Sequence, residues 1–264
     1  MYASNLLGSD PRITNFGGGN TSLKTTETDP LSGEERSVLW VKGSGGDLGT
    51  ATAQSFASLD LEKVLALEGL RDARQLHEDD IVPLYAHCTH NLNPVACSID
   101  TPLHAFVPFA AVSHMHADSV IAIAASADAE ALTQEVWNGK LGYVPWRRPG
   151  FDLGLMIRDE LAKNPSIQGV LMGSHGFICW ADDWEACYDL TLDIINQAQA
   201  FLDRHNPDKA FGQVRFTDDV DSRAGWLRLL PALRGLTAVD GQALYASVDA
   251  PEEVLAFLAS EKAP

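Results

Sequence analysis

The sequence has few cysteines and too little positive charge to balance its acids. Its four cysteines include no Cys-x-x-Cys pair, so we expect reduced thiols rather than a disulfide framework. Lysine and arginine total 19 against 36 acidic residues, a formal net charge of −17 with a pI of about 4.7. We therefore expect no nucleic acid and no anionic membrane as the main partner.

Long apolar runs are also missing. A bilayer span needs about 18 uninterrupted apolar residues, and no stretch of the sequence reaches that length. Residues 1–10 have neither the basic start nor the apolar core of a signal peptide. These absences predict a cytoplasmic protein.

What is present is the composition of a folded chain of enzyme size. Of its 264 residues, 45% are hydrophobic and 21% charged, and the mean hydropathy is −0.07, which excludes disorder over most of the length. Apolar patterning predicts strands at 37–41, 111–117, 167–172 and 176–180, and helices at 58–67, 98–106, 150–163, 182–205 and 251–258.

Two segments are harder to interpret. We expect a polar loop over 25–35, and the apolar run at 118–125 fits a helix or a strand equally well. The alternation of strands and helices elsewhere indicates an α/β layered fold around one central sheet. We expect one domain over 1–205 and an acidic, less regular extension over 206–264 packed on it.

The histidines form the most informative pattern. His114 and His116 are two residues apart in a predicted strand, so their side chains point to the same face, as ligands of one metal ion must. His175 follows another predicted strand, where loop side chains of α/β sheets gather around ligands. Three neutral imidazoles that leave one coordination position open are typical of a catalytic zinc.

Other candidate ligands are less specific. Asp100 lies four residues before His104, so one helix face would carry both. Asp100 could be a metal ligand, a general base, or a carboxylate that complements the helix dipole. We expect His104 to be a structural residue or an outer partner of the site rather than a ligand. The stretch from His87 to His90 offers soft ligands but lacks the companion pair of a structural zinc site.

Two glycine-rich turns could bind an anion. Residues 17–22 and 43–46 can direct backbone N–H groups at phosphate oxygens without a blocking side chain, and Ser44 adds a hydroxyl. Neither turn matches a dinucleotide fingerprint or a P-loop, which argues against NAD and ATP. Beside a metal site, the turns predict a small phosphorylated substrate.

These stretches, taken in order, resemble the class II aldolase/adducin family. The matching segments are Gly19-Asn20-Thr21-Ser22, Lys42-Gly43-Ser44-Gly45, Ser98-Ile99-Asp100-Thr101-Pro102-Leu103-His104, His114-Met115-His116 and His175-Gly176. Residues 6–10, 101–108 and 175–180 look most similar to the aldolase portion of bifunctional rhamnulose-1-phosphate aldolase/short-chain dehydrogenases.

The resemblance implies a three-layer α/β/α sandwich with a mixed, largely antiparallel central sheet. It implies one Zn²⁺ per chain, or another divalent transition metal, with Asp100 at the acidic position of a site shared in a homo-tetramer. The implied metal ligands are His114, His116 and His175, and the implied phosphate-binding residues are Gly19, Asn20, Ser44, Gly45 and Ser98.

The implied activity is cleavage of a ketose 1-phosphate, by likeness L-rhamnulose 1-phosphate, to dihydroxyacetone phosphate and an aldehyde. Simple aldolases of the family usually carry glutamate where this chain has Asp100, whereas aspartate followed by Thr-Pro resembles the ribulose-5-phosphate 4-epimerases. An epimerase is therefore one alternative. A non-catalytic adducin-like module is the other, although such modules lack the three histidines.

Overall fold

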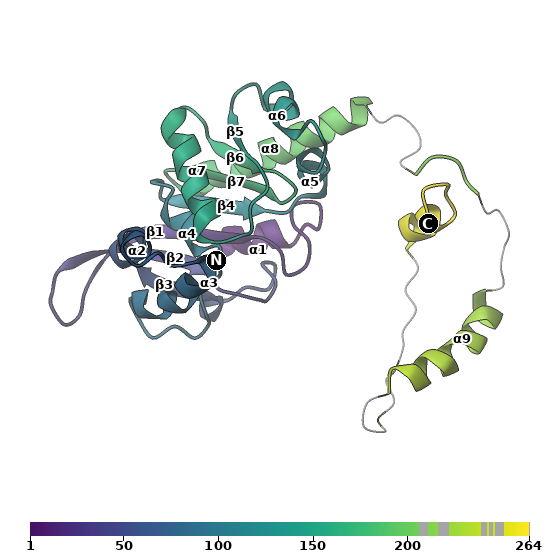
Figure 1. Cartoon of the computed structure of the whole chain (residues 1–264), viewed down its shortest axis with the longest axis horizontal. Helices are drawn as coiled ribbons and strands as arrows, with labels where there is room; N and C mark the ends of the chain where they lie inside the picture. The colour runs from purple at the N-terminus through teal and green to yellow at the C-terminus, as the bar shows by residue number, and fades with distance from the viewer. Residues whose placement is uncertain (206–210, 216–221, 239–241, 243–244, 246–250, 264) are drawn as a thin grey trace. The chain divides into compact units, whose positions relative to one another are not determined.

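The computed structural model describes residues 1–205, 211–215, 222–238, 242, 245 and 251–263 (Figure 1). It divides the chain into two units, Met1–Leu202 and Asp203–Pro264, which are described separately. Among the residues described, no helix is both long and apolar enough to cross a membrane.

A seven-stranded sheet forms the centre of the first unit. Its strands are β1 (Asn20–Thr28), β2 (Glu35–Lys42), β3 (Phe56–Asp60), β4 (Ala111–Met115), β5 (Leu141–Val144), β6 (Gly169–Met172) and β7 (Gly176–Ala181). Their order in the sheet is β3-β2-β1-β4-β7-β6-β5. Only the β5–β6 pair in this sheet is parallel, which confirms the expected mixed, largely antiparallel architecture.

Helices cover both faces of this sheet. Those of the first unit are α1 (Tyr2–Gly8), α2 (Leu61–Arg74), α3 (Glu78–Ile81), α4 (Thr101–Ala105), α5 (Asp118–Ala124), α6 (Ala129–Trp137), α7 (Phe151–Lys163) and α8 (Trp184–His205), with short 3-10 turns at Ala53–Ser55 and Val82–Cys88. The hydrophobic core on one face involves α5, α6 and α8, and the two core clusters on the other involve α2, α4 and α7.

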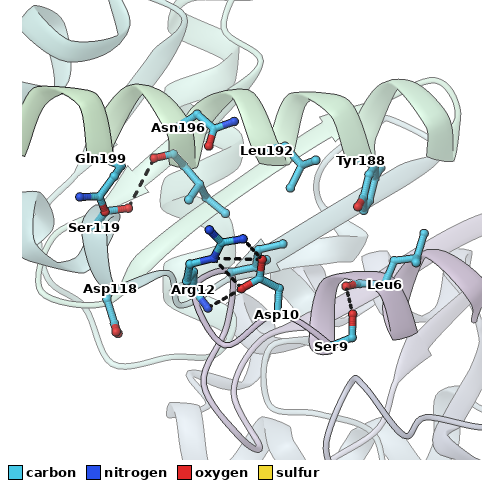
Figure 2. Close-up of a pocket in the computed structure, with 12 residues that line it drawn as sticks. Leu6, Ser9, Asp10, Arg12, Asp118, Ser119, Tyr188, Leu192, Asn196 and Gln199 are labelled. Carbon is cyan, nitrogen blue, oxygen red and sulfur yellow. Dashed lines mark hydrogen bonds and ion pairs between the residues drawn. The ribbon is translucent and has the colours of Figure 1, made fainter. Parts of the chain in front are cut away.

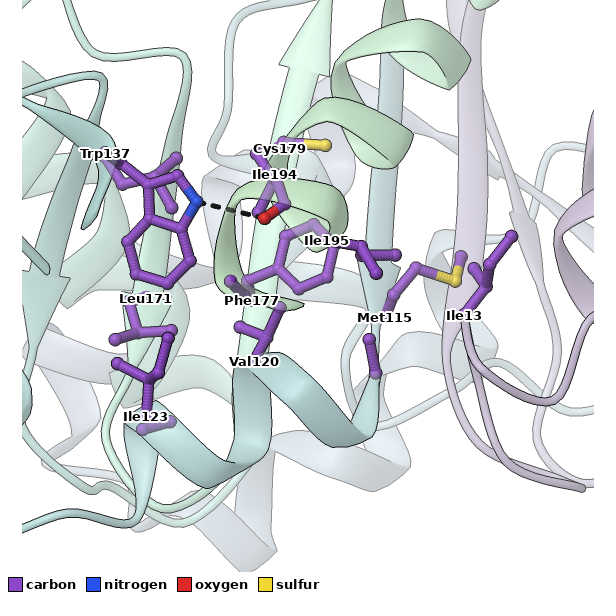
Figure 3. Close-up of a cluster of buried hydrophobic side chains, with 14 of the residues drawn as sticks. Ile13, Met115, Val120, Ile123, Trp137, Leu171, Phe177, Cys179, Ile194 and Ile195 are labelled. Atoms are coloured by element: carbon purple, nitrogen blue, oxygen red, sulfur yellow. Dashed lines mark hydrogen bonds between the residues drawn. The ribbon is translucent and has the colours of Figure 1, made fainter. Parts of the chain in front are cut away.

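Strand alternation separates the two cores. Met115 and Phe177, on β4 and β7, point into the cluster beneath α8, where Trp137 is fully buried (Figure 3). The indole Nε1–H of Trp137 donates to the carbonyl oxygen of Ile194 at 3.1 Å, so this large side chain is buried without an unpaired donor. Every second residue of β4 therefore faces the other way, toward α4 and α7.

Several predicted boundaries were wrong, for identifiable reasons. The helix expected from residue 58 begins at Leu61, because the preceding residues pair with β2 and the Asp60 side chain accepts from the Lys63 N–H as the N-cap. The expected loop at 25–35 is shorter, because β1 continues to Thr28 in register with β2. The run at 118–125 is helical, as α5.

The second unit contains two helices among its described residues, α9 (Ser222–Leu236) and α10 (Glu252–Leu258). The structure confirms the helix expected at 251–258 to within a residue, while α9 was not anticipated. The expectation that residues 206–264 pack on the first domain remains a prediction.

Lys24 ties β1 to the segment around α4. Its Nζ donates to the carbonyl oxygens of His104 at 2.7 Å and Phe109 at 2.9 Å. Burial of the amine lowers the pKa of Lys24 to about 7. The neutral amine still has two hydrogens, enough for both carbonyl acceptors.

We predict that Lys24 makes stability depend on pH. Unfolded lysine titrates near pH 10.4, so between about pH 7 and that value the unfolded chain binds more protons here than the folded chain with its pKa of about 7. The free energy of unfolding of the wild type, minus that of Lys24→Met, should therefore rise with pH across this window and stay flat below it. Urea denaturation at pH 6, 8 and 9.5 measures this difference. Lys163→Met, which removes one exposed positive charge, serves as the control.

Candidate metal centre

Three histidines converge at the end of strands β4 and β7. His114 lies on β4, His116 follows the strand on the same face, and His175 occupies the turn between β6 and β7. One candidate ligand atom from each lies within 4.8 Å of the other two, and the Nε2 atoms of His114 and His116 are 3.1 Å apart. The sequence-predicted cluster is thus assembled by pairing of strands far apart in the chain.

The protein sets the protonation of these imidazoles. His114 Nδ1–H donates to the carbonyl oxygen of Phe177 at 2.9 Å, which leaves its Nε2 lone pair free for a ligand. Burial lowers the pKa of all three histidines, that of His116 to about 4, so the rings are neutral at pH 7. Neutral imidazole is the form that binds a metal ion.

One buried nitrogen without a hydrogen-bond partner indicates that the site suits a metal ion. His175 Nδ1 is buried without a hydrogen-bond partner, and an orphaned polar group of this kind costs about 1–3 kcal/mol. The nitrogen-only donor set, the neutral rings and the unpaired atom all fit a divalent transition metal. The cluster is therefore consistent with a divalent metal site, and the identity of the metal remains a prediction.

Asp100 lies beside the cluster, in the turn before α4. Asn20 Nδ2 donates to Asp100 Oδ2 at 2.8 Å, and Ser98 Oγ is 3.5 Å from the same oxygen. The other oxygen, Oδ1, is buried and has no partner. Burial raises the pKa of Asp100, while the Asn20 hydrogen bond, the nearby His175 and Ser98 oppose the rise.

Two of the predicted phosphate-binding residues, Gly19 and Asn20, lie next to the histidine cluster. Gly19 packs against β4, where an added Cβ would lie 2.9 Å from the carbonyl oxygen of His114, and its φ of +68° suits glycine. Asn20 follows it at the start of β1. These positions join the turn at 17–19 to the histidines, and their role toward phosphate stays a prediction.

The second glycine turn is hydrogen-bonded to the segment that leads to Ser98. Ser44 and Gly45 are exposed in the loop after β2. The Ser44 N–H donates to the carbonyl oxygen of Ala96 at 3.0 Å, which holds this loop against the segment leading to Ser98. The Ser44 backbone N–H is therefore occupied, and the hydroxyl group and the open backbone of Gly45 are what this loop offers an anion.

His104 has the structural character expected of it. The ring is fully buried, and both nitrogens have protein partners, Ser22 Oγ at 2.8 Å and Asn20 Oδ1 at 2.5 Å. The hydrogen bonds that Ser22 and Lys24 make to His104 were not anticipated from the sequence. The available signal was the alternation of polar residues at 20, 22 and 24, which marks one face of a strand.

The competing stretch at 87–90 does not assemble a metal site within the described residues. His90 Nε2 lies 3.6 Å from a Glu27 carboxylate oxygen, and Cys88 Sγ lies 3.6 Å from the carbonyl oxygen of Leu84. Among the described residues, the potential metal ligands that lie close enough together to share one ion are His114, His116 and His175.

A pocket of about 530 Å³ lies between the N-terminal segment and α8 (Figure 2). Tyr188 and Asn196 of α8 line one side, and Asp10 and Arg12, which form an ion pair, line the other. None of the predicted site residues lines this pocket. Cavity size therefore does not locate the candidate site, whereas the ligand chemistry does.

Comparisons with known proteins identify the family of this chain. The Class II Aldolase and Adducin N-terminal domain family matches residues 1–202. A Bacillus subtilis (strain 168) protein named uncharacterized oxidoreductase YuxG is 38% identical over 267 residues, and this chain spans 38% of its length.

Solved structures show the same fold. The N-terminal class II aldolase domain of a conserved Thermoplasma acidophilum protein superposes with a TM-score of 0.68 at 31% identity, covering 76% of this chain and 91% of that one. L-fuculose-1-phosphate aldolase from Thermus thermophilus gives 0.51 at 15% identity, covering 79% and 96%. Together with the family match, the seven-stranded sheet and the histidine cluster place this chain in the class II aldolase and adducin N-terminal domain family.

Proposed function

We propose that this chain is a metal-dependent class II aldolase that cleaves a ketose 1-phosphate to dihydroxyacetone phosphate and an aldehyde. The observation that carries the proposal is the cluster of His114, His116 and His175 with the unpaired Oδ1 of Asp100 buried beside it. We further propose L-rhamnulose 1-phosphate as the ketose and Zn²⁺ as the metal, from the sequence resemblance.

Retro-aldol cleavage assigns a separate task to each part of the site. A base takes the proton of the hydroxyl on the carbon beyond the breaking bond, the carbonyl of the aldehyde forms, and the bonding electron pair passes to the three-carbon product as its enediolate. In this proposal Asp100 takes the proton through Oδ1, the oxygen that has no hydrogen-bond partner. A divalent metal bound by the histidines supplies Lewis-acid stabilisation of the negative charge.

The glycine turns support the choice of a phosphorylated substrate. The exposed loop at 44–45 is hydrogen-bonded through the Ser44 N–H to Ala96, and Asn20, which follows the turn at 17–19, is hydrogen-bonded to Asp100. Phosphate bound there would anchor the substrate while its carbonyl end faces the histidines. Holding the substrate in this way lowers the entropic part of the barrier.

A 4-epimerase is the second candidate, favoured by Asp100 followed by Thr101 and Pro102. Such an enzyme breaks the same bond and rejoins it after the aldehyde has turned over. Product analysis separates the two, because only the aldolase releases the aldehyde. What the B. subtilis relative does over the rest of its length does not bear on this choice, because this chain spans 38% of it.

We predict that His114→Ala abolishes metal binding and activity while the fold is retained. The substitution removes one of three ligands but leaves the strands of the sheet paired. Metal content by plasma mass spectrometry should fall from about one divalent ion per chain to near zero, with an unchanged circular dichroism spectrum. His87→Ala, which removes an exposed histidine outside the cluster, should keep its metal. Equal metal content in the two variants would contradict the site.

We also predict that Asp100→Asn retains the metal but loses catalysis. The amide keeps the size of the side chain but cannot take a proton, so kcat should fall about 10²- to 10⁴-fold. Release of dihydroxyacetone phosphate from L-rhamnulose 1-phosphate measures the loss, and the exposed Asp72→Asn is the matched control. Full activity of Asp100→Asn would show that another group removes the proton.

A further inference from the structure

One face of β1 carries three polar side chains directed at the segment that holds Asp100. Asn20, Ser22 and Lys24 alternate along the strand, and we call them the polar row. Each forms a hydrogen bond with His104: Lys24 with its carbonyl oxygen, Ser22 with Nδ1, and Asn20 with Nε2. A single buried residue of α4 thus joins the whole row.

The hydrogen-bond partners fix which atoms carry hydrogen. In its ionised form, which a general base requires, the Asp100 carboxylate only accepts, so Asn20 directs its NH₂ group to Asp100 Oδ2, at 2.8 Å. The amide oxygen of Asn20 then faces His104 Nε2, which must donate to it. Burial lowers the pKa of His104 to about 3, so the ring is neutral and its Nδ1 accepts from the Ser22 hydroxyl.

The opposite orientation of the Asn20 amide would be unfavourable. It would place the amide oxygen 2.8 Å from Asp100 Oδ2, where two acceptors repel each other. The two ends of an amide have the same shape, so packing alone does not choose between them. The N–H of His104 favours the same orientation as the carboxylate, because it needs an acceptor at that position.

We propose that His104 is a positioning residue for Asp100. Acting through Asn20, it orients the carboxylate so that Oδ2 is held by a hydrogen bond and Oδ1 is left for the reacting hydroxyl. His104 does not touch the substrate in this arrangement, since its ring is fully buried and both nitrogens are occupied. The consequence for catalysis rests on the proposed function, whereas the order of donors and acceptors does not.

Nuclear magnetic resonance of the full chain tests the hydrogen-bond order directly. With ¹⁵N-labelled histidine, the His104 signals are assigned as those absent from His104→Gln. We expect Nε2 to be protonated and Nδ1 to be unprotonated at pH 7.5. A ring protonated at Nδ1, on both nitrogens or as a mixture of tautomers overturns the inference, whatever the enzyme activity.

Kinetics then test the positioning role. His104→Leu removes the donor and should lower kcat about 10- to 100-fold, as loss of an outer partner does at metal sites, with KM changed about threefold or less. His104→Gln returns an N–H close to the position of Nε2 and should recover most of kcat. Equal losses in the two variants, each compared at equal native fraction by circular dichroism, overturn the proposal.

Lys24→Met is the matched control. It removes buried hydrogen bonds to the same segment but leaves the path through Asn20 intact. It should lower the stability while kcat of the folded fraction stays within about threefold of wild type. A loss of kcat as large as that of His104→Leu would overturn the proposal, because it would show that kcat depends on the anchoring of α4 and not on the hydrogen bond between His104 and Asn20. If the wild type cleaves no ketose phosphate, the proposed function fails, and the tautomer measurement still decides the hydrogen-bond order.

Discussion

The candidate site depends on the antiparallel pairing of β1 with β4. This register sets Asn20 opposite His114, so the residue that follows the glycine turn lies beside the first histidine of the cluster. Both strands are central in the sheet, with β2 and β7 on their outer sides, so neither can slip by one residue without reversing the faces of its side chains. The approach of Gly19 to the His114 carbonyl oxygen depends on the same register.

Burial of the three histidines and Asp100 has two opposing effects, one on metal binding and one on folding stability. It keeps the three imidazoles neutral and therefore ready to bind a metal, but it also leaves His175 Nδ1 and Asp100 Oδ1 without partners. Each unpaired atom costs about 1–3 kcal/mol, which the hydrophobic cores on the two faces of the sheet must offset. A bound cation or substrate would recover part of this cost, so ligand binding and folding stability are coupled through these two atoms.

The ligands could be predicted from the sequence because their signal is local. His114 and His116 are two residues apart on a strand, and His175 stands in a short turn. The polar row could not be recognised in this way, because strands are usually detected by alternating apolar residues and this row is polar. The residues of β1 were therefore predicted as a turn followed by a loop. Its role depends on hydrogen bonds to His104, which is 82 residues from Ser22 and 84 residues from Asn20 in the chain. No local sequence pattern encodes contacts over such separations.

The surroundings of Asp100 bear on the three roles that the sequence leaves open for it. An aspartate at the start of a helix ordinarily accepts from the first free N–H groups, yet Asp100 is the N-cap of α4 and its side chain makes no such bond. Ser98 supplies the local hydrogen bonds instead, since its carbonyl oxygen accepts from Thr101 and its hydroxyl from the Asp100 N–H. The Asp100 carboxylate therefore takes no part in capping α4. A residue that departs from the usual N-cap pattern with no gain for the helix is typical of a functional site, which supports the proposed role of Asp100.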